Sequence, residues 1–399
     1  MLRLAAVGAV TAVVGCSRRE APPPAPVVVV PADAKTADAA TKANQPWPEL
    51  ADYPIVAPQR VIELPARPDV PRFEVGGPVI AGDVAVVASS QFGFAAVDWR
   101  RGQVAWTKPA GEHVAPPLVR DADVVLIGEC VAPPDVPDGE HLLGCVRVVT
   151  RAGADHAYLA IHGKEKKVAA FAAQAGAQQL WNEAPDNAVR WQRGDQAVTI
   201  DLVTGIATPA SATTPPLVIQ YKDKRWDVAY SDGKLVASEK GREAWAIKRT
   251  FAAVLGAVTL PGQPPMVRVA QVGAAAGGGP EVIVHDVDAT GSLHAQVAKP
   301  APGIQLLGWG ASSIGDAALA VRLDSSLRRD YVVGYAANAL LMWVWPLPDT
   351  PRADPVGVAI APDAVVVFHD GDTFTVLPEL SAPPTAPGAA RAASQNPTP

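Results

Sequence analysis

Residues 73–108 contain four short β-strands in succession, and this unit constrains the fold more than any other stretch of the chain. The expected strands cover residues 77–81, 84–89, 93–98 and 102–107 and are rich in Val, Ala and aromatic residues. Gly, Asp and Ser occupy the breaks between them, and each run is too short to be a helix. A sheet of four antiparallel strands cannot cover its own two faces, so similar sheets must stack against it.

The same pattern recurs in eroded form along the chain to about residue 377. A glycine in the turn before an outer strand marks it at Gly102, Gly205, Gly241 and Gly291, and the last three are 36 and 50 residues apart. Such intervals suit four-stranded blades. The sequence therefore predicts an all-β fold, a β-propeller with seven or eight blades of four antiparallel strands. We favour eight, because residues 54–64 can complete the last blade. Residues 156–162 and 167–173, followed by 179–181, read as strands of one of these blades.

The amino-terminal residues predict a lipid anchor. Arg3 is followed by an apolar run over residues 4–14, and Cys16 comes directly after Gly15. This resembles a bacterial lipobox, in which residues 1–15 are removed as a lipoprotein signal peptide and Cys16 carries the lipid. A membrane-spanning helix is one alternative, but it needs about twenty apolar residues. A secretory signal with a chance cysteine is the other alternative.

The lipobox predicts a mature protein in the cell envelope, tethered to a membrane through Cys16. Ser17 favours the outer membrane, with the protein facing the periplasm. Residues 16–54 are rich in Pro, Ala, Asp and Thr and read as a disordered tether, and residues 381–399 read as a disordered tail. Residues 55–380 remain for the propeller.

The two cysteines outside the lipobox predict a disulfide. Cys130 and Cys145 flank a loop rich in Pro, Gly and Asp between two apolar runs. An even pair in an oxidising compartment favours a bond that staples the base of this loop. Two separate buried thiols or a metal pair are the alternatives, although no further cysteine and no Cys-x-x-Cys supports a zinc site.

Charge and motifs argue against several classes of function. The chain has a formal net charge of −6 and no basic stripe, so nucleic acid is not an expected partner. No nucleophile elbow, Walker lysine loop or His-Glu-x-x-His motif is present, so we expect neither an enzyme nor a catalytic residue. The run from Asp286 to Gly291 resembles half of an EF-hand, but Val297 stands where the bidentate Glu belongs. We therefore expect no metal and no cofactor.

Tryptophan and histidine give two further candidates. The tryptophans are spaced at the scale of a blade, and most are expected to pack between adjacent blades. Trp343 and Trp345 share one side of a strand and are the best candidates for a local aromatic patch. His141, His156 and His162 lie near one another in sequence and are read as scattered surface residues rather than metal ligands.

The stretch 76–109 resembles a repeat of the pyrroloquinoline-quinone-type (PQQ-like) propellers. Residues 95–98 stand where that repeat has its third strand, and residues 102–106 match its turn and final Trp. Residues 201–205 and 286–291 match its Asp-x-x-Thr-Gly turn approximately. The resemblance implies a propeller fold similar to the lipid-anchored propeller of the outer-membrane barrel-assembly machinery. It transfers no cofactor-binding or partner-binding residue to this chain.

Three hypotheses of function follow from these features. The first is a non-enzymatic scaffold in the cell envelope that binds an envelope protein, since propellers expose loops and short protected edges. The second is a sensor that binds a small molecule or a glycan at the mouth of the channel. The third is a relative of quinone-dependent dehydrogenases, for which no residue set is apparent. Fold does not choose among them.

Overall fold

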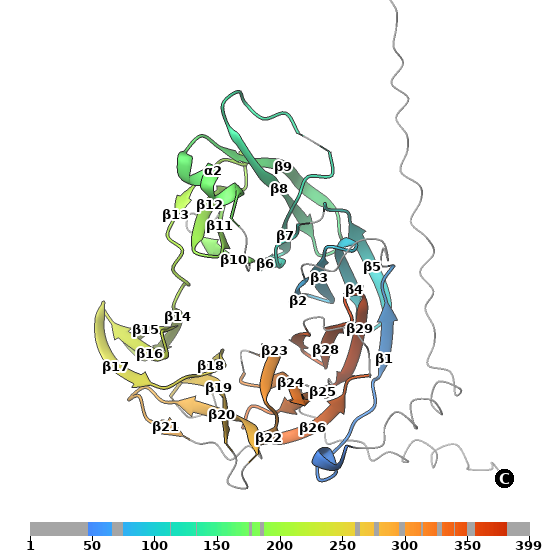
Figure 1. Cartoon of the computed structure of the whole chain (residues 1–399), viewed down its shortest axis with the longest axis vertical. Coiled ribbons are helices and arrows are strands. Elements are labelled where there is room, and N and C mark those ends of the chain that lie inside the picture. The colour runs from blue at the N-terminus through green and yellow to red at the C-terminus, as the bar shows by residue number, and fades with distance from the viewer. Residues whose placement is uncertain are drawn as a thin grey trace, which may run out of the picture.

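Seven antiparallel sheets surround a central axis as the blades of a β-propeller in the computed structural model of the chain (Figure 1). Each blade has four strands, and they run from an inner strand at the axis to an outer strand at the rim (Figure 1). The structure describes residues 47–65, 75–111, 113–132, 134–174, 178–183, 187–259, 264–274, 279–294, 300–312, 314–324, 329–338, 340–348 and 356–380.

Blades 1 to 3 follow one another along the chain. Blade 1 consists of β2 (Val75–Ala81), β3 (Val84–Ser89), β4 (Gly93–Asp98) and β5 (Gln103–Lys108). Blade 2 consists of β6 (Leu118–Arg120), β7 (Asp123–Gly128), β8 (His141–Thr150) and β9 (Asp155–Gly163). After the helix α2 (Lys166–Ala172), blade 3 consists of β10 (Gln178–Glu183), β11 (Ala188–Arg193), β12 (Gln196–Asp201) and β13 (Ala207–Ala210).

Blades 4 to 6 repeat the same order. Blade 4 consists of β14 (Leu217–Tyr221), β15 (Lys224–Ser231), β16 (Lys234–Glu239) and β17 (Arg242–Lys248). Blade 5 consists of β18 (Ala253–Val258), β19 (Met266–Ala274), β20 (Pro280–Val287) and β21 (Leu293–His294), and β22 (Ala301–Pro302) also pairs with β20. Blade 6 consists of β23 (Gln305–Ala311), β24 (Ala317–Asp324), β25 (Arg329–Tyr335) and β26 (Leu341–Pro346).

Blade 7 joins the two ends of the folded chain. Its three inner strands come from the carboxyl-terminal side: β27 (Gly357–Ala361), β28 (Ala364–His369) and β29 (Thr373–Pro378). Its outer strand is β1 (Arg60–Glu63), which pairs antiparallel with β29. The prediction that the first strand closes the ring is therefore confirmed. Hydrogen bonds between the first and last strands hold the propeller shut.

The preference for eight blades is wrong, because the separate blade expected around residues 156–181 does not exist. β9 is the fourth strand of blade 2 and β10 is the first strand of blade 3. The expected strand between them is the helix α2, in which Val168 and Phe171 lie three residues apart and are both fully buried. The segment is rich in Ala and has apolar residues at this spacing, which favours a helix. With seven residues it is too short for the helical pattern to be distinct in the sequence.

Apolar side chains fill the interfaces between adjacent blades, with one exception. Six clusters of buried residues lie between blades 1 and 2, 2 and 3, 4 and 5, 5 and 6, 6 and 7, and 7 and 1. The boundary between blades 3 and 4, here called the seam, has no such cluster among the described residues. Every buried apolar residue of blade 4 belongs instead to its interface with blade 5.

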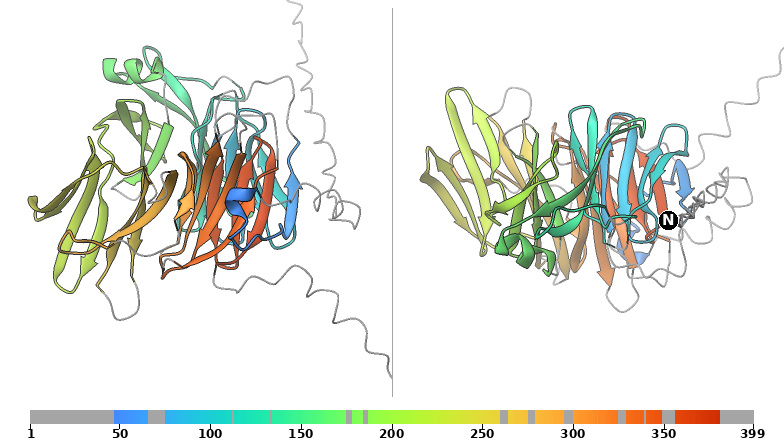
Figure 2. Two further views of the ribbon diagram at one scale, coloured as in Figure 1. Left: turned by 60° about the horizontal axis from the view of Figure 1, so that its bottom comes forward. Right: turned by 90° about the horizontal axis from the view of Figure 1, so that it is seen from above.

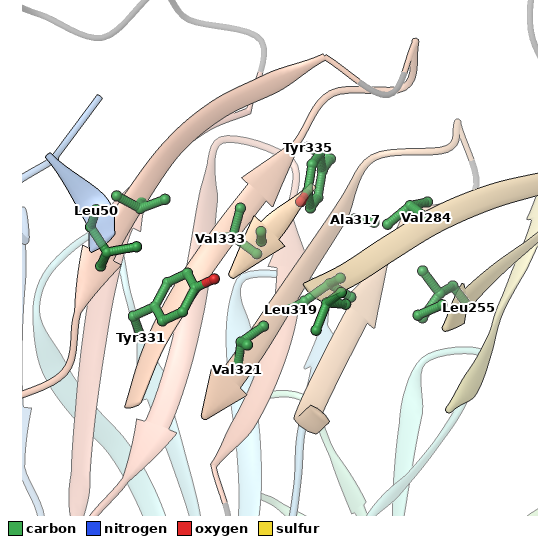
Figure 3. Close-up of a cluster of buried hydrophobic side chains, with 13 residues drawn as sticks. Leu50, Leu255, Val284, Ala317, Leu319, Val321, Tyr331, Val333 and Tyr335 are labelled. Carbon is green, nitrogen blue, oxygen red and sulfur yellow. The ribbon is translucent and has the colours of Figure 1, made fainter. Parts of the chain in front are cut away.

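Residues 47–64, here called the strap, run along the rim before the first complete blade. η1 (Pro48–Leu50) inserts Leu50 between blades 5 and 6, beside Tyr331 of β25 (Figure 3). Val344 of β26 then pairs with the strap: its amide donates to the Pro54 carbonyl at 2.8 Å, and its carbonyl accepts from the Val56 amide at 3.0 Å. The strap thus covers the outer edge of blade 6 on its way to blade 7. No helix in the described ranges is long and apolar enough to cross a bilayer.

Candidate functional site

The structure tests one of the two sites predicted from cysteine. Cys130 and Cys145 form the expected disulfide, with their Cα atoms 5.0 Å apart. Cys130 follows the end of β7, and Cys145 lies within β8 opposite Gly128. The bond therefore ties the base of the loop over residues 129–140 to the sheet. The predicted lipid-bearing Cys16 lies outside the described residues.

The stapled loop belongs to the largest elaboration of the ring. β8 has ten residues and β9 has nine, whereas the corresponding strands of the other blades reach at most eight and seven. We call residues 129–142 and 161–174, which include α2, the blade 2 projection. In Figure 1 it rises at the top of the ring, and η1 of the strap lies at the bottom. The projection therefore stands across the ring from the point where the strap joins it.

A charged contact fixes the start of β8 to the end of β9 within the projection. His162 Nδ1 contacts the Glu140 carboxylate, and Lys164 Nζ lies 3.5 Å from the same group. The hydrogen bond to His162, assisted by Lys164, holds the pKa of Glu140 below its ordinary value. Glu140 therefore stays ionised well into the acidic range and keeps the loop attached.

α2 anchors the projection to blade 3. Phe171 packs edge-on against Trp191 of β11, with ring centroids 4.9 Å apart. Trp191 donates its indole N–H to Gln178 Oε1 at 3.0 Å, and Gln178 donates to the Val114 carbonyl at 3.2 Å. The solvent side of the same segment is charged, with Lys164, Glu165, Lys166 and Lys167 exposed. The helix thus presents a polar surface from a fixed base.

A second surface lies at the central channel. A groove of about 440 Å³ is lined by inner strands of blades 1, 6 and 7 and by Ala252. These strands approach closely: a Cβ on Gly308 would lie 1.9 Å from the Val356 carbonyl oxygen, so only glycine fits there. Trp309 borders the groove with 41% of its surface exposed. The side chains that line the groove are apolar, more of its exposed surface is polar than apolar, and it carries one accessible aromatic ring.

The aromatic patch expected at Trp343 and Trp345 is wrong. Both side chains do face the same side of β26, as strand alternation predicts, but they pack into the interface between blades 6 and 7 and are almost fully buried. Trp99, Trp191 and Trp226 are buried between blades in the same way, so the expected packing role of the tryptophans is confirmed for them. Among the described tryptophans the exposed one is Trp309, which the sequence did not single out.

Blade 7 contains a hydrogen-bonded series of Asp, His and Thr side chains that was not expected from sequence. His369 Nδ1 lies 2.7 Å from Asp370 Oδ2, and His369 Nε2 lies 2.8 Å from Thr375 Oγ1. This is the order of groups that activates a nucleophile in some hydrolases. Here His369 and Thr375 are buried, and the ring of Trp345 packs on His369. These hydrogen bonds therefore tie β28 to β29, and the buried Thr375 hydroxyl is closed to a substrate.

Contacts within the protein occupy the acidic residues of the turn near Asp286. Asp286 forms a buried bidentate ion pair with Arg268, at 2.8 and 2.9 Å. Asp288 accepts hydrogen bonds from Thr290 and Ser292 and thereby shapes the turn. Among the described residues, no group of three potential ligands could hold a metal ion. The three histidines make separate contacts. His156 pairs with Asp123 and His162 pairs with Glu140, while His141 is exposed at the start of β8.

Basic side chains concentrate on blade 4, although they form no continuous run in sequence. Residues 217–250 contain eight Lys and Arg and five Asp and Glu, a net charge of +3 in a chain of −6. Seven of these basic side chains are exposed: Lys222, Lys224, Arg225, Lys240, Arg242, Lys248 and Arg249. A count of charge per blade would have found them; a search for a basic run does not.

Comparisons with known proteins show no family for this chain. No protein-family model and no curated protein matches the sequence. Among solved structures, the chain is similar to BamB from Moraxella catarrhalis, with 14% identity, coverage of 82% of this chain and 94% of that one, and a TM-score of 0.33. The C-terminal WD40 domain of Sif2 has 10% identity, coverage of 82% and 99%, and a TM-score of 0.47. A chain of the mitotic checkpoint complex has 12% identity, coverage of 81% and 95%, and a TM-score of 0.45.

Proposed function

We propose that this protein is a non-enzymatic interaction scaffold of the bacterial cell envelope, anchored to the outer membrane by a lipid on Cys16 and facing the periplasm. The observation that carries the proposal is the position of the blade 2 projection, which stands across the ring from the strap (Figure 1). A tether that leads from Cys16 would reach the ring at the strap, on the side away from the projection (Figure 1). It would therefore leave the projection free to meet an envelope protein.

The structure of the projection suits a binding surface. The disulfide, the contact of Glu140 with His162 and the packing of Phe171 on Trp191 fix its backbone from three sides. A surface that is ordered before binding loses less conformational entropy when a partner arrives. The chain also lacks the sequence motifs of common enzyme classes. These features favour recognition of a protein over catalysis.

Site-specific crosslinking in the native envelope tests the proposal. A photo-crosslinker at Lys167 of the projection should capture one reproducible envelope protein. The matched control is Arg101, whose side chain is 75% exposed on blade 1. Cys16→Ala should abolish membrane retention and reduce capture. Capture of the same proteins from both positions, or of none from Lys167, would contradict the proposed scaffold.

The channel groove favours a second candidate, recognition of a small molecule or a glycan. Trp309 offers an exposed ring on which a sugar or an apolar ring can stack, above a groove of matching size. A ligand of this kind should raise the melting temperature of the protein, and Trp309→Ala should remove the shift. A shift that survives Trp309→Ala would place the ligand elsewhere.

A further inference from the structure

The charge of the ring is distributed unevenly between opposite blades. Blade 4 carries a net charge of +3 over residues 217–250. Blade 7, made of residues 60–63 and 357–378, contains one basic and four acidic residues, a net charge of −3. Figure 2 shows blade 4, in yellow-green and yellow, at the end of the molecule away from the blue β1 of blade 7. Blade 4 is therefore a positively charged blade in an acidic chain, with a net negative blade at the opposite end of the molecule.

Most of the positive charge on blade 4 is not neutralised locally. Arg225 pairs with Asp227 at 3.3 Å, and Lys234 pairs with Glu243 at 3.0 Å. Lys240, Arg242 and Lys248 form no ion pair within the part of the chain that the structure describes. Neither do the exposed Lys224 and Arg249. These five cations lie at both ends of the strands, so they spread over the blade and do not converge on one small anion.

Blade 4 is also accessible on its face toward the seam. Its face toward the seam has no buried apolar cluster, and Val218 on that face is 44% exposed. Its outer strand β17 alternates between exposed and partly buried residues for most of its length. Exposed edges invite pairing with another strand, and charged residues on the edge oppose it. Arg242 and Lys248 occupy the two ends of β17, so the edge is protected against strand addition and offers charge instead.

We infer that blade 4 docks on the anionic phospholipid headgroups of the membrane to which the propeller is tethered. The inference rests on the proposed envelope location. A broad set of exposed Lys and Arg is attracted to an anionic lipid surface without a specific pocket. A basic surface adds electrostatic attraction to that of a lipid anchor and so decides which side of the tethered ring meets the membrane. The acidic blade 7 is repelled by the same surface, so the two blades together orient the ring.

Vesicle sedimentation of the full chain with Cys16→Ala tests the inference, because this chain lacks the acyl anchor. We expect binding to phosphatidylcholine vesicles that contain phosphatidylglycerol, weaker binding to phosphatidylcholine alone, and loss of the difference at high salt. Lys240→Glu, Arg242→Glu and Lys248→Glu together should weaken the anionic binding about a hundredfold or more. The matched control combines Arg101→Glu, Lys166→Glu and Lys167→Glu, which changes the net charge equally on blades 1 and 2. It should retain most of the binding.

The results of this experiment test membrane docking by blade 4 independently of the proposed scaffold function. Equal binding to both kinds of vesicle, or equal loss in both triple variants, would overturn it. Loss of a captured protein partner from the blade 4 variant, with vesicle binding unchanged, would make this surface a protein interface and also overturn it. Far-ultraviolet circular dichroism and a melting curve establish that both variants are folded. Vesicle binding of the unacylated chain does not depend on lipidation of Cys16 or on the blade 2 projection.

Discussion

The interface between blades 7 and 1 differs from the seam between blades 3 and 4. At the first interface, Phe92 of blade 1 packs edge-on against Phe368 of blade 7. Trp99 and Arg100 also donate hydrogen bonds to Asp363 across it, at 3.0 and 2.7 Å. The hydrogen bond that Arg100 donates holds the pKa of the Asp363 carboxyl below its ordinary value. Apolar and polar contacts therefore seal the interface next to the blade where the chain ends meet.

The seam is held by fewer and more polar contacts. Arg190 of blade 3 forms a bidentate pair with Glu183 of the same blade and donates to the Thr213 carbonyl at 3.0 Å. Thr213 lies in the linker over residues 211–216 that leads to blade 4. Only two small residues, Ala188 and Ala197, are buried in blade 3 outside its apolar cluster with blade 2. The chain itself therefore connects the two blades here.

The difference teaches that packing is strongest where the ring depends on it. Blade 7 is completed by noncovalent pairing of β1 with β29, so loss of the neighbouring contacts opens the propeller. Blades 3 and 4 stay connected through a short linker even when they pack poorly. This releases one face of blade 4 for another surface. Four measurements test this difference between the two interfaces.

Truncation of a core residue should show the largest difference between the two regions. Phe368 is fully buried and touches aromatic rings of both blades at the closure. Phe368→Ala should lower the free energy of unfolding by about 3–5 kcal/mol. Val218→Ala at the seam should change it by less than about 0.5 kcal/mol. Urea unfolding measures both, and similar losses would show that the seam is packed after all.

Two bidentate arginine pairs offer a matched comparison of buried and accessible charge. Arg268 and Asp286 are 1% and 0% exposed, and Arg268 also donates to the carbonyls of Ala337 and Gly315 in blade 6. Arg268→Ala leaves a buried carboxylate without its partner and should cost about 3–5 kcal/mol.

Arg190 and Glu183 are 17% and 22% exposed, so the same change at the seam should cost only about 1 kcal/mol. The hydrogen bond from Arg190 holds the pKa of Glu183 below its ordinary value. The stability that the pair contributes is therefore fully present above the ordinary pKa of a glutamate and is lost as the pH falls through the lower pKa of the folded protein. Equal costs for Arg190→Ala and Arg268→Ala at neutral pH would refute the distinction.

Removal of the disulfide should have an intermediate effect that touches neither interface. Cys130→Ser with Cys145→Ser opens a loop with a sequence separation of 15 residues. The free energy of unfolding should fall by about 3 kcal/mol, because the unfolded chain gains freedom. Hydrogen exchange should accelerate in residues 129–142 and stay unchanged in β28. Faster exchange at the closure would show that the projection supports the whole ring.

A pH titration should reveal a smaller effect on the side of blade 4 that is sealed. His285 of β20 is buried with both ring nitrogens unpaired. Burial, and then the charge of Arg249, lower the pKa of His285, and Asp286 opposes this. The unfolded chain then binds a proton that the folded protein does not, so stability is full above the ordinary histidine pKa and declines below it.

The slope should reach at most about 1.4 kcal/mol per pH unit. His285→Leu should flatten this part of the profile, and Val218→Ala should leave it unchanged. An unaltered slope in His285→Leu would assign the proton to another group.

Much of the fold could be predicted from sequence because the strands and turns are local. The four strands of blade 1 match the expected ranges within two residues at each end, since alternation, glycine turns and short apolar runs act within one sheet. The disulfide was predicted for the same reason. The closing strand was predicted because the last blade otherwise has three strands. The count of blades was not, because β9, α2 and β10 belong to two blades whose boundary depends on contacts between them.

The candidate surfaces were harder to predict than the fold. Trp343 and Trp345 alternate as expected, but both faces of a blade can be buried, so alternation cannot say which aromatic residue meets water. Trp309 is exposed because its inner strand borders the channel. The basic surface combines residues from β15, β17 and the positions beside these strands, and the fold brings them together on one blade.

Local sequence sets the four-stranded antiparallel sheets and the disulfide, because both depend on backbone geometry and on residues close together in the chain. The closing segment could be predicted because the last blade has only three strands on the carboxyl-terminal side, although its partner β29 lies at the other end of the folded chain. Tertiary structure decided the number of blades, the opposition of strap and projection, and the one boundary without an apolar core. Those depend on which faces meet across the ring. A side chain's environment there is set by residues far away in sequence, and no local pattern contains that information.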